Sequence, residues 1–359
     1  MLDGMFFSGH GFAEGNRILL RILDKAGYRV RIQARDRSEM QLVLPADEIR
    51  YITSFEQTPL SGRDVYINNQ VGSEVRVHPE FRINIARTTF ETDRIPDFWL
   101  PELNRFDELW LQCSFNLVTF RNSGVQVPLV QMPNFFDVGE YDPEGERLPL
   151  PASESFLFLS VFDMQPRKGY DVLLQAFLNE FGPEDSAALV IKVRSEQDAA
   201  KLEAIARDHP KPGRMKPPVY IIGQMLTVQE IRSLYRACDA FVLPTRGEGW
   251  GRPFFEAMLM ELPAIGTKWS GQTEYMDDSN SYLVEVERLI RIENYELPMF
   301  NGHYWAEPSL ADLQRKMRYV AEHRTEAKAT GRSARRQLME QYGLEQLAER
   351  VASALNKYA

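Results

Sequence analysis

Two glutamates lie on either side of a glycine-rich stretch in the second half of the sequence, Leu243-Pro-Thr-Arg-Gly-Glu-Gly-Trp-Gly-Arg-Pro-Phe-Phe-Glu-Ala257. The apolar run before this stretch predicts a buried strand, and Pro253 favours the first turn of a helix after it. We therefore expect Glu248 on the loop and Glu256 one turn into the helix, with both carboxylates facing one cleft. Carboxylates accept hydrogen bonds from sugar hydroxyls, and the N–H groups of Gly249–Arg252 can bind phosphate. For Glu256 alone, the alternative is a charge that interacts with the helix dipole.

A basic pair occurs in the stretch Val161-Phe-Asp-Met-Gln-Pro-Arg-Lys-Gly169, between a predicted strand and an amphipathic helix. In this position Arg167 and Lys168 can reach an anion that lies over the end of the sheet. The alternative is a solvated basic pair beside a turn.

Glycines also mark the first loop, Ser8-Gly-His-Gly-Phe-Ala-Glu-Gly-Asn16, which precedes a helix predicted from Arg17. Glycine lets the backbone approach a phosphate closely, and the following helix start attracts one. Together with Asp36, roughly 20 residues further on, the loop also fits a dinucleotide site. A nicotinamide-dependent dehydrogenase is therefore one alternative function. It leaves the paired glutamates and the Pro166–Gly169 stretch without a role.

A fourth strand-to-helix loop is Trp269-Ser-Gly-Gln-Thr-Glu274. Ser270 or Thr273 either caps the following turn or contributes to the site.

Short apolar runs alternate with segments of helical period along most of the chain, which predicts α/β layers with mainly parallel sheets. In the first half we expect a helix at Arg17–Lys25 and strands at Met5–Phe7, Tyr28–Gln33, Val65–Asn68, Ile83–Ala86 and Leu109–Gln112. The prolines of Tyr141–Pro151 indicate a linker. Beyond it we expect strands at Phe156–Val161, Ala188–Val193, Val219–Ile222, Ala240–Leu243 and Ala264–Gly266, with helices at Tyr170–Phe181, Gln197–Asp208, Val228–Cys238 and Phe254–Met260. The end of the chain, Ser309–Tyr358, is strongly helical in composition.

This alternation predicts two doubly wound, Rossmann-like domains facing a central cleft. Residues 1–145 would form the first domain and residues 146–330 the second, while a terminal helix at 331–359 would pack back toward the first. Ligands of such sheets bind beyond the carboxyl ends of the strands, so the four loops are the places to look for chemistry.

The composition excludes several classes of protein. The 359 residues are 44% hydrophobic and 26% charged, which is typical of a folded globular chain, and the net charge of −9 argues against a nucleic-acid partner. Cys113 and Cys238 form neither a disulfide framework nor a zinc site. Because no apolar run approaches the roughly 18 residues of a membrane span and no export signal is evident, a cytoplasmic protein is expected.

Basic residues cluster on the first predicted helix and after it: Arg17, Arg21, Lys25, Arg29, Arg31, Arg35 and Arg37. An anionic membrane surface attracts such a cluster, so peripheral contact at the cytoplasmic face of a membrane is one prediction. An ordinary solvated face is the alternative.

The four loops together resemble those of retaining glycosyltransferase family 4, whose members have the GT-B fold. The paired-glutamate motif from Glu248 to Glu256 carries most of the resemblance. Its companions occur in order along the chain: Gly11-Phe-Ala-Glu14, Gly27-Tyr-Arg-Val30, Asn134-Phe-Phe-Asp137, Pro166-Arg-Lys-Gly169, Gly223, Leu234-Tyr-Arg-Ala-Cys-Asp239 and Gly271-x-x-Glu274.

The resemblance implies transfer of a hexose-type sugar from a nucleoside-diphosphate sugar to an unidentified glycan, lipid or small-molecule acceptor. Glu248 and Lys168 would be catalytic, with Glu248 on the hydroxyls of the donor sugar, Lys168 on the diphosphate and Glu256 on the ribose. The other donor contacts implied are Arg167, Gly249, Trp250, Gly251, Arg252, Gly11 and Phe12, with Gly223, Gln224 and Met225 near the base. The family needs no metal or other cofactor for this reaction. A sugar-nucleotide epimerase or a non-catalytic sugar-nucleotide binder remains the alternative.

The chain departs from the family pattern at three places. Asp163 stands where an arginine is usual, and Arg167 is a candidate to replace its charge. The family's N-terminal histidine is also absent, and His10, Glu91 and Asp93 are the candidates on the acceptor side. Phe135 replaces a glycine before the linker. The remaining histidines, His78, His209, His303 and His323, lack the spacing of ligands and are interpreted as structural or surface residues.

Overall fold

The computed structural model describes residues 1–9, 11–37, 44–60, 62, 64–151, 155–210 and 215–358, and the chain forms two compact units. The first unit comprises Met1–Val138, Glu293–His303 and Glu340–Ala359, and the second comprises Gly139–Ile292 and Tyr304–Met339. Each unit contains one six-stranded parallel sheet, so the expected doubly wound α/β fold is confirmed. The division follows Val138, whereas the sequence suggested a boundary at residue 145.

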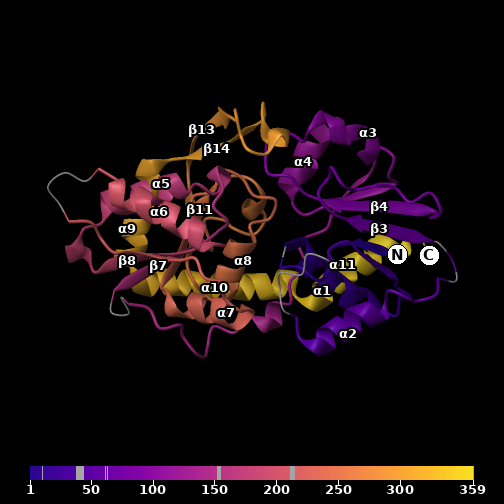
Figure 1. Ribbon diagram of the computed structural model, residues 1–359, viewed down its shortest axis with the longest axis horizontal. Helices are drawn as coiled ribbons and strands as arrows, with labels where there is room; N and C mark the ends of the chain where they lie inside the picture. The colour runs from indigo at the N-terminus through magenta and orange to yellow at the C-terminus, as the bar shows by residue number, and fades with distance from the viewer. Residues whose placement is uncertain are drawn as a thin grey trace. The chain divides into compact units, whose positions relative to one another are not determined.

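In the first unit the strand order is β2-β1-β3-β4-β5-β6. Strands β3 and β4 lie side by side in Figure 1. The strands are β1 (Leu2–Gly4), β2 (Ile32–Ala34), β3 (Val65–Asn69), β4 (Ile83–Thr88), β5 (Glu108–Leu111) and β6 (Leu129–Gln131). The helices are α1 (Gly11–Lys25), α2 (Ala46–Ser54), α3 (Leu100–Leu103), α4 (Ser114–Asn122) and α11 (Leu344–Asn356). Although α11 is the last helix of the chain, it packs against α1, and its Leu347, Val351 and Leu355 join the core of this unit.

The start of the chain differs from the sequence prediction. Met5–Phe7 is not a strand, because the N–H groups of Phe6 and Phe7 donate to the carboxylate of Asp36 (2.9 and 3.0 Å) and not to a neighbouring strand. The strand instead occupies Leu2–Gly4. Helix α1 begins at Gly11, six residues before the predicted start at Arg17.

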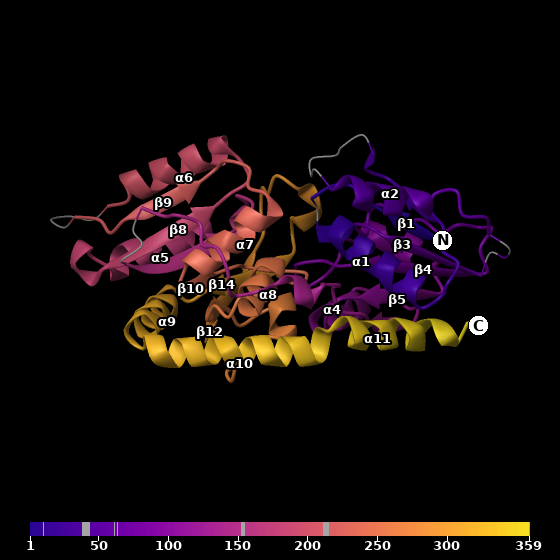
Figure 2. The same ribbon diagram turned by 90° about the horizontal axis from the view of Figure 1, so that it is seen from below.

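In the second unit the strand order is β12-β11-β10-β7-β8-β9. The strands are β7 (Phe156–Val161), β8 (Ala187–Lys192), β9 (Val219–Ile222), β10 (Ala240–Leu243), β11 (Ala264–Thr267) and β12 (Tyr282–Val284), with a separate antiparallel pair of β13 (Val286–Arg291) and β14 (Tyr304–Pro308). The helices are α5 (Tyr170–Glu180), α6 (Glu196–Asp208), α7 (Val228–Ala237), α8 (Arg252–Leu259), α9 (Leu310–Glu322) and α10 (Arg324–Tyr342). Helix α9 packs against α5, β11 and β12 (Figure 2).

The sequence explains why the elements of the second unit form where they do. Strand β8 is buried along its whole length, which suits a central parallel strand covered on both faces, so its apolar run is nearly uninterrupted. Helix α7 begins at Val228 because Thr227 and Glu230 form a capping box, in which each side chain accepts the other's backbone N–H (3.2 and 2.7 Å).

The strand order of the second unit also locates its ligand crevice. The chain starts at β7, adds β8 and β9 on one side, and then returns to add β10, β11 and β12 on the other. In such sheets ligands bind at the carboxyl ends of the two strands where the order reverses, here β7 and β10. The loops after these strands are Phe162–Gly169 and Pro244–Gly251.

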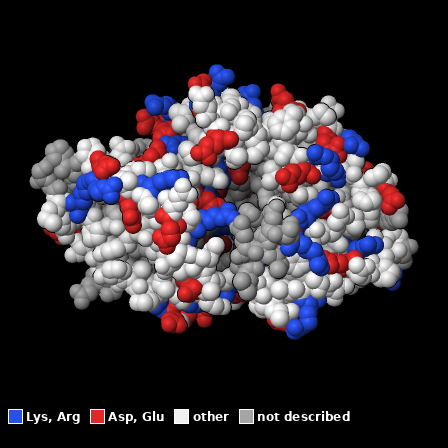
Figure 3. Space-filling model, viewed as in Figure 1, with Lys and Arg blue, Asp and Glu red and all other residues white. Residues whose placement is uncertain are grey.

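The basic cluster of the first unit is smaller than its sequence suggests. Arg17 is buried, and its guanidinium donates to the carbonyls of Phe6 (2.8 Å) and Ser8 (3.1 Å). The side chains of Arg21, Arg35 and Arg37 form ion pairs with Glu48, Asp3 and Glu56, respectively. Four of the seven basic residues are thus buried or paired with acidic side chains, and contact with an anionic membrane stays a prediction. On the face drawn in Figure 3, basic and acidic side chains are interspersed.

Within the described ranges, no helix is both long and apolar enough to span a bilayer.

Candidate functional site

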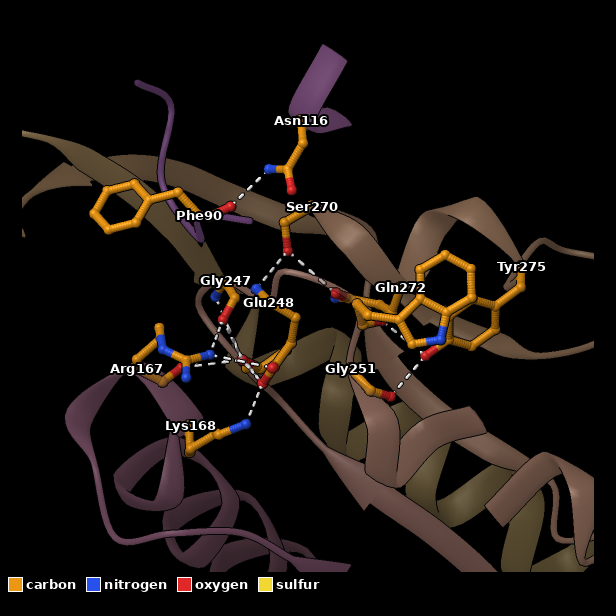
Figure 4. Close-up of polar contacts among 12 residues, drawn as sticks. Phe90, Asn116, Arg167, Lys168, Gly247, Glu248, Gly251, Ser270, Gln272 and Tyr275 are labelled. Atoms are coloured by element: carbon orange, nitrogen blue, oxygen red, sulfur yellow. Dashed lines mark hydrogen bonds and ion pairs between the residues drawn. The ribbon is translucent and has the colours of Figure 1, made fainter. Parts of the chain in front are cut away.

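The carboxylate of Glu248 is the centre of a buried ionic cluster at the carboxyl ends of β7 and β10 (Figure 4). Its Oε1 lies 2.6 Å from Nζ of Lys168, and its Oε2 lies 3.1 Å from Nη1 of Arg167. The hydroxyl of Thr245 donates to the same Oε1 (3.0 Å). The structure therefore joins the glutamate and the basic pair that the sequence had placed on two separate loops.

Burial acts on both partners of this cluster. Burial raises the pKa of the Glu248 carboxyl, but the positive charges of Lys168 and Arg167 outweigh it and hold that pKa below its ordinary value. Burial lowers the pKa of Lys168, and the nearby carboxylate of Glu248 opposes this shift without cancelling it. Glu248 is therefore ionised at neutral pH, whereas the ammonium of Lys168 depends on a nearby negative charge.

The backbone of the two loops is fitted together by a glycine. Gly169 has φ of +66°, and a Cβ at this position would lie 1.9 Å from the carbonyl oxygen of Pro244. The N–H of Arg246 donates to the carbonyl of Arg167 (2.6 Å). Only glycine allows this approach, and the approach brings the side chains of Arg167 and Lys168 against Glu248.

On its other side, the loop of Glu248 rests on the loop after β11. The hydroxyl of Ser270 accepts the N–H of Glu248 (2.8 Å), and Gly271 donates its N–H to the carbonyl of Glu248 (3.0 Å). A Cβ on Gly271 would lie 2.3 Å from the carbonyl oxygen of Gly249. The suggested capping role of Ser270 is wrong, because its side chain caps no helix and is turned to the Glu248 backbone.

The segment between the two glutamates is held by aromatic residues. Gly251 is the N-cap of α8, with φ of +84°, and the hydroxyl of Tyr275 lies within hydrogen-bonding distance of the carbonyls of Trp250 (3.0 Å) and Gly251 (2.7 Å). The rings of Trp250 and Tyr275 are 5.0 Å apart. The start of α8, with Arg252 and Pro253 in its first turn, is thereby fixed at the end of the Glu248 loop.

Glu256 lies on α8, as predicted, and contacts a different element from Glu248. The hydroxyl of Tyr235 on α7 donates to Glu256 Oε2 (3.2 Å), and Arg252 lies 3.6 Å away, one turn earlier on α8. Burial raises the pKa of Tyr235, and the adjacent Glu256 carboxylate adds to this shift, so the phenol remains a hydrogen-bond donor.

The predicted base region begins where β9 ends. Gly223 is buried, and a Cβ there would lie 2.7 Å from the Cα of Glu196 at the start of α6. Gln224 and Met225, which follow it, are exposed. Gly223 thus has a packing reason to be glycine, and the two following side chains are accessible to a ligand.

Comparison with known proteins finds a family model that matches most of the second unit. Residues 153–291 match the model of the family described as glycosyl transferases group 1. This segment is similar to the group 1 glycosyltransferases. The resemblance stated from the motifs is thereby confirmed.

Two curated relatives match part of the chain. D-inositol 3-phosphate glycosyltransferase of Xylanimonas cellulosilytica is 32% identical over 145 residues, which cover 39% of this chain and 32% of that protein. The serotype-specific mannosyltransferase WbdA of Escherichia coli is 27% identical over 162 residues, which cover 44% of this chain and 17% of that protein. The chain thus spans about a third of the length of one relative and less of the other.

Solved structures resemble the chain over almost its whole length. Anabaena HepE, in a crystal with UDP-glucose, has a TM-score of 0.66 and 14% identity, with 99% of each chain covered. The trehalose-6-phosphate synthase OtsA has a TM-score of 0.68 and 12% identity, again with 99% of each chain covered. The fold is therefore that of the GT-B glycosyltransferases.

The first loop differs from the dinucleotide-site interpretation. Gly11 and Phe12 lie in the first turn of α1, where backbone N–H groups are available to a ligand. Asp36 is buried, and both its oxygens accept N–H groups of the loop, including that of Ser8 (2.7 Å). Asp36 therefore holds the loop in shape. His10, a candidate on the acceptor side, lies outside the described residues.

The other two acceptor-side candidates, Glu91 and Asp93, are half-buried in the loop after β4. Between them, the hydroxyl of Thr92 donates to the carbonyl of Arg94 (2.7 Å) and lies 3.0 Å from Nδ1 of His303. Because the hydroxyl of Thr92 donates to Arg94, this contact fits the tautomer of His303 in which Nδ1 carries the hydrogen and donates it. Burial lowers the pKa of His303, and Asp93 opposes this shift.

The structural alternative given for His303 agrees with its burial, but the sequence indicated no partner for it. The residue ends the segment Glu293–His303, which belongs to the first unit although β13 and β14 on either side belong to the second. Phe300 of the same segment stacks on Phe90, with ring centroids 4.8 Å apart. No spacing in the sequence connects these positions, which are about 200 residues apart.

Phe135, the departure from a family glycine, is fully buried beneath the guanidinium of Arg87, which lies 4.6 Å from its ring centroid. The aromatic ring is thus part of the first unit's core, three residues before that unit's main segment ends.

Within the described ranges, no group of three or more His, Cys, Asp or Glu side chains could hold a metal ion.

Proposed function

We propose that this chain is a retaining glycosyltransferase that transfers a hexose-type sugar from a nucleoside-diphosphate sugar to an acceptor hydroxyl, without a metal ion. One observation carries the proposal: an ionised, buried Glu248 held by Lys168 and Arg167 at the carboxyl ends of the strands where the sheet order reverses. This position is where an α/β sheet binds ligands, and the cluster supplies both an acceptor for hydroxyls and donors for phosphate.

Lys168 stabilises the leaving diphosphate in this proposal. An ammonium has three N–H donors, and the contact with Glu248 uses one of them, so the other donors can point to phosphate oxygens. The approach of a diphosphate also supplies the negative charge that a buried ammonium requires. Arg167 adds a second cation, and the N–H groups of Gly249, Trp250, Gly251 and Arg252 add backbone donors. Fixed donors of this kind stabilise the charge that develops as the glycosidic bond breaks.

The two glutamates divide the rest of the donor between them. Glu248, ionised at neutral pH, accepts hydrogen bonds from hydroxyls of the transferred sugar. Glu256 accepts those of the ribose, with its carboxylate oriented by the hydroxyl of Tyr235. Gly223, Gln224 and Met225 lie beside the base, and Gly11 and Phe12 remain candidate donor contacts.

The acceptor hydroxyl attacks the anomeric carbon from the face that the leaving group departs. Because the new bond forms on the face where the bond to the diphosphate breaks, the anomeric configuration is retained. The proton of the acceptor hydroxyl passes to an oxygen of the departing diphosphate. Glu91 and Asp93 remain our candidates for contacts with the acceptor, together with His10.

The first experiment is a thermal-shift screen of nucleoside-diphosphate sugars with EDTA present throughout. UDP-sugars come first, because the similar structure of HepE was obtained with UDP-glucose, and GDP-sugars come next. We expect stabilisation by one donor in EDTA. A shift that appears only after magnesium or manganese is added contradicts metal independence.

Product analysis with the donor so identified then separates the possible reactions. Transfer gives a glycosylated acceptor with the donor's anomeric configuration, which NMR coupling constants report. A new sugar nucleotide formed without acceptor favours an epimerase, and binding without any product favours a non-catalytic binder.

Substitution of the basic pair tests the site itself. Lys168→Ala is expected to weaken nucleoside diphosphate binding about tenfold or more, because hydrogen bonds to charged groups contribute roughly 1.5–3 kcal/mol. Arg167→Ala should have a smaller effect. Unchanged affinity in both variants places the diphosphate elsewhere.

A further inference from the structure

A second buried lysine lies at the same edge of the second unit's sheet. Lys192 is the last residue of β8 and is only 6% exposed. Its ammonium donates to the carbonyl of Val193. Among the described residues it has no carboxylate within ion-pairing distance, which leaves donors of a nine-tenths buried cation without a protein acceptor.

A cation in this situation is costly for the folded protein. Ionised groups inside a protein require paired charges or several hydrogen bonds, and one backbone carbonyl satisfies only a third of an ammonium. Burial lowers the pKa of Lys192, and the carboxylates of Asp163 and Glu196 oppose this shift only from a distance. A ligand that supplied a negative charge would remove the cost.

The sheet places Lys192 between two parts of the proposed donor site. It pairs in register with Val161, the last residue of β7, and its carbonyl accepts the N–H of Phe162 (3.1 Å), where the loop to Lys168 begins. On the other side, the N–H of Val193 donates to the carbonyl of Ile222 (3.0 Å), one residue before Gly223. Along this edge the order is therefore Glu248, Lys168, Lys192 and then the base region.

We propose that Lys192 is a further donor-binding residue, whose ammonium binds the phosphate attached to the nucleoside. The inference rests on the proposed function, because it requires a nucleotide in the second unit. Lys168 lies toward Glu248 and the transferred sugar, so it binds the phosphate attached to the sugar. Lys192 lies toward Gly223 and the base, so it binds the other phosphate.

The division between the two lysines gives a specific test. The probes are UDP and UMP, GDP and GMP, and ADP and AMP, and calorimetric titration first identifies the pair that binds the unmodified protein. Lys192→Met, which keeps the length of the side chain without its charge, should weaken both the diphosphate and the monophosphate about tenfold or more. Lys168→Met should weaken the diphosphate strongly and the monophosphate much less.

Two controls separate binding from folding. Lys201→Met removes the same charge from an exposed position on α6 and should leave every affinity unchanged. Without nucleotide, Lys192→Met should melt at the same temperature as the unmodified protein or higher, because a costly buried charge has been removed. Lys192→Gln is measured in parallel and keeps the test decisive if the methionine variant does not fold.

Each outcome bears on one claim. If no nucleoside diphosphate binds the unmodified protein, the proposed function fails and this inference fails with it. If the unmodified protein binds one and the Lys192 variants bind it equally well, this inference alone is overturned. A Lys192 variant that loses affinity for the diphosphate but not for the monophosphate overturns the assignment to the nucleoside-side phosphate. A lower melting temperature with unchanged affinity shows a purely structural lysine.

Discussion

The ionic cluster of Glu248, Lys168 and Arg167 is built so that each charge depends on the others. Removing one partner of a buried pair leaves the other without compensation, which costs on the order of 3–5 kcal/mol. A bound diphosphate changes this balance, because it offers Lys168 and Arg167 another negative charge. Under the proposed function, the stability of the cluster and the binding of a donor are therefore coupled through the same two cations.

The first prediction follows from this coupling. Glu248→Gln should lower the melting temperature of the ligand-free protein, because Lys168 and Arg167 lose their carboxylate. Its affinity for bare nucleoside diphosphate should be unchanged or higher, while turnover with the complete donor should fall strongly. The measurements are thermal unfolding, calorimetric titration and initial rates. If the affinity for the diphosphate falls together with the turnover rate, the proposed contact between Glu248 and the transferred sugar is wrong.

Glu256 should behave in the opposite way. Glu256→Gln keeps an acceptor for the ribose but loses the charge, so its affinity should fall for the complete donor and for the bare diphosphate alike. The same titrations measure this. Tyr235→Phe, which removes the hydroxyl that contacts Glu256, serves as the milder companion variant. Full affinity in Glu256→Gln would mean that the ribose is bound elsewhere.

His303 provides a pH-dependent prediction. Its pKa is lower in the folded protein than the unfolded value of about 6.5, so the unfolded chain binds more protons as the pH falls below that value. Its neutral form contributes stability that is present above pH about 6.5 and is lost as the pH falls toward the folded-state pKa. Between pH 7.5 and 5.5, the melting temperature of the unmodified protein should therefore fall further than that of His303→Gln. Parallel pH profiles of the two proteins would refute the burial of a neutral ring.

At the scale of elements, the contact between the loops after β7 and β10 depends on Gly169. In Gly169→Ala, a Cβ would meet the Pro244 carbonyl at 1.9 Å, so the loops must separate. We expect the free energy of unfolding to fall by several kcal/mol. We also expect diphosphate binding to be lost. Gly27→Ala is the matched control, since Gly27 has a similar φ of +80° but no atom within 4 Å of the added Cβ. Equal effects of the two substitutions would show that backbone strain alone is responsible.

The elements also explain what could be predicted from the sequence. β7, β9 and β10 were placed at their observed ends, because apolar runs bounded by turn residues define buried parallel strands. β13 and β14 were not predicted, since β13 is largely exposed and lacks such a run. The first strand was misplaced because a carboxylate distant in sequence, Asp36, binds the N–H groups that a strand would use.

The site was predicted to a similar extent. Residue types and order along the chain pointed to Glu248, Lys168 and Glu256, but no sequence pattern reveals that Lys168 and Arg167 both contact Glu248. Lys192 was not predicted as a site residue, because it ends an apolar strand and forms no motif. Its environment becomes visible only when the neighbouring strands are known.

At the scale of the whole molecule, the terminal helix α11 belongs to the core of the first unit. Leu347→Ala should destabilise that unit by about 2–5 kcal/mol, because the side chain is fully buried against α1. Leu344→Ala, at an exposed position on the same helix, is the control and should change stability little. Differential scanning calorimetry measures both. Equal melting profiles of the two variants would mean that α11 does not support the first unit in solution.

The chain passes between the two units four times, after residues 138, 292, 303 and 339. Neither unit is therefore a continuous gene segment. A single recombination event near residue 138 would exchange the second unit together with two pieces of the first, the segment carrying His303 and the helix carrying Leu347. A chimera designed to change only the donor must keep those two pieces from the parent of the first unit. Inheritance of the second unit is thus tied, by the path of the backbone, to inheritance of part of the first.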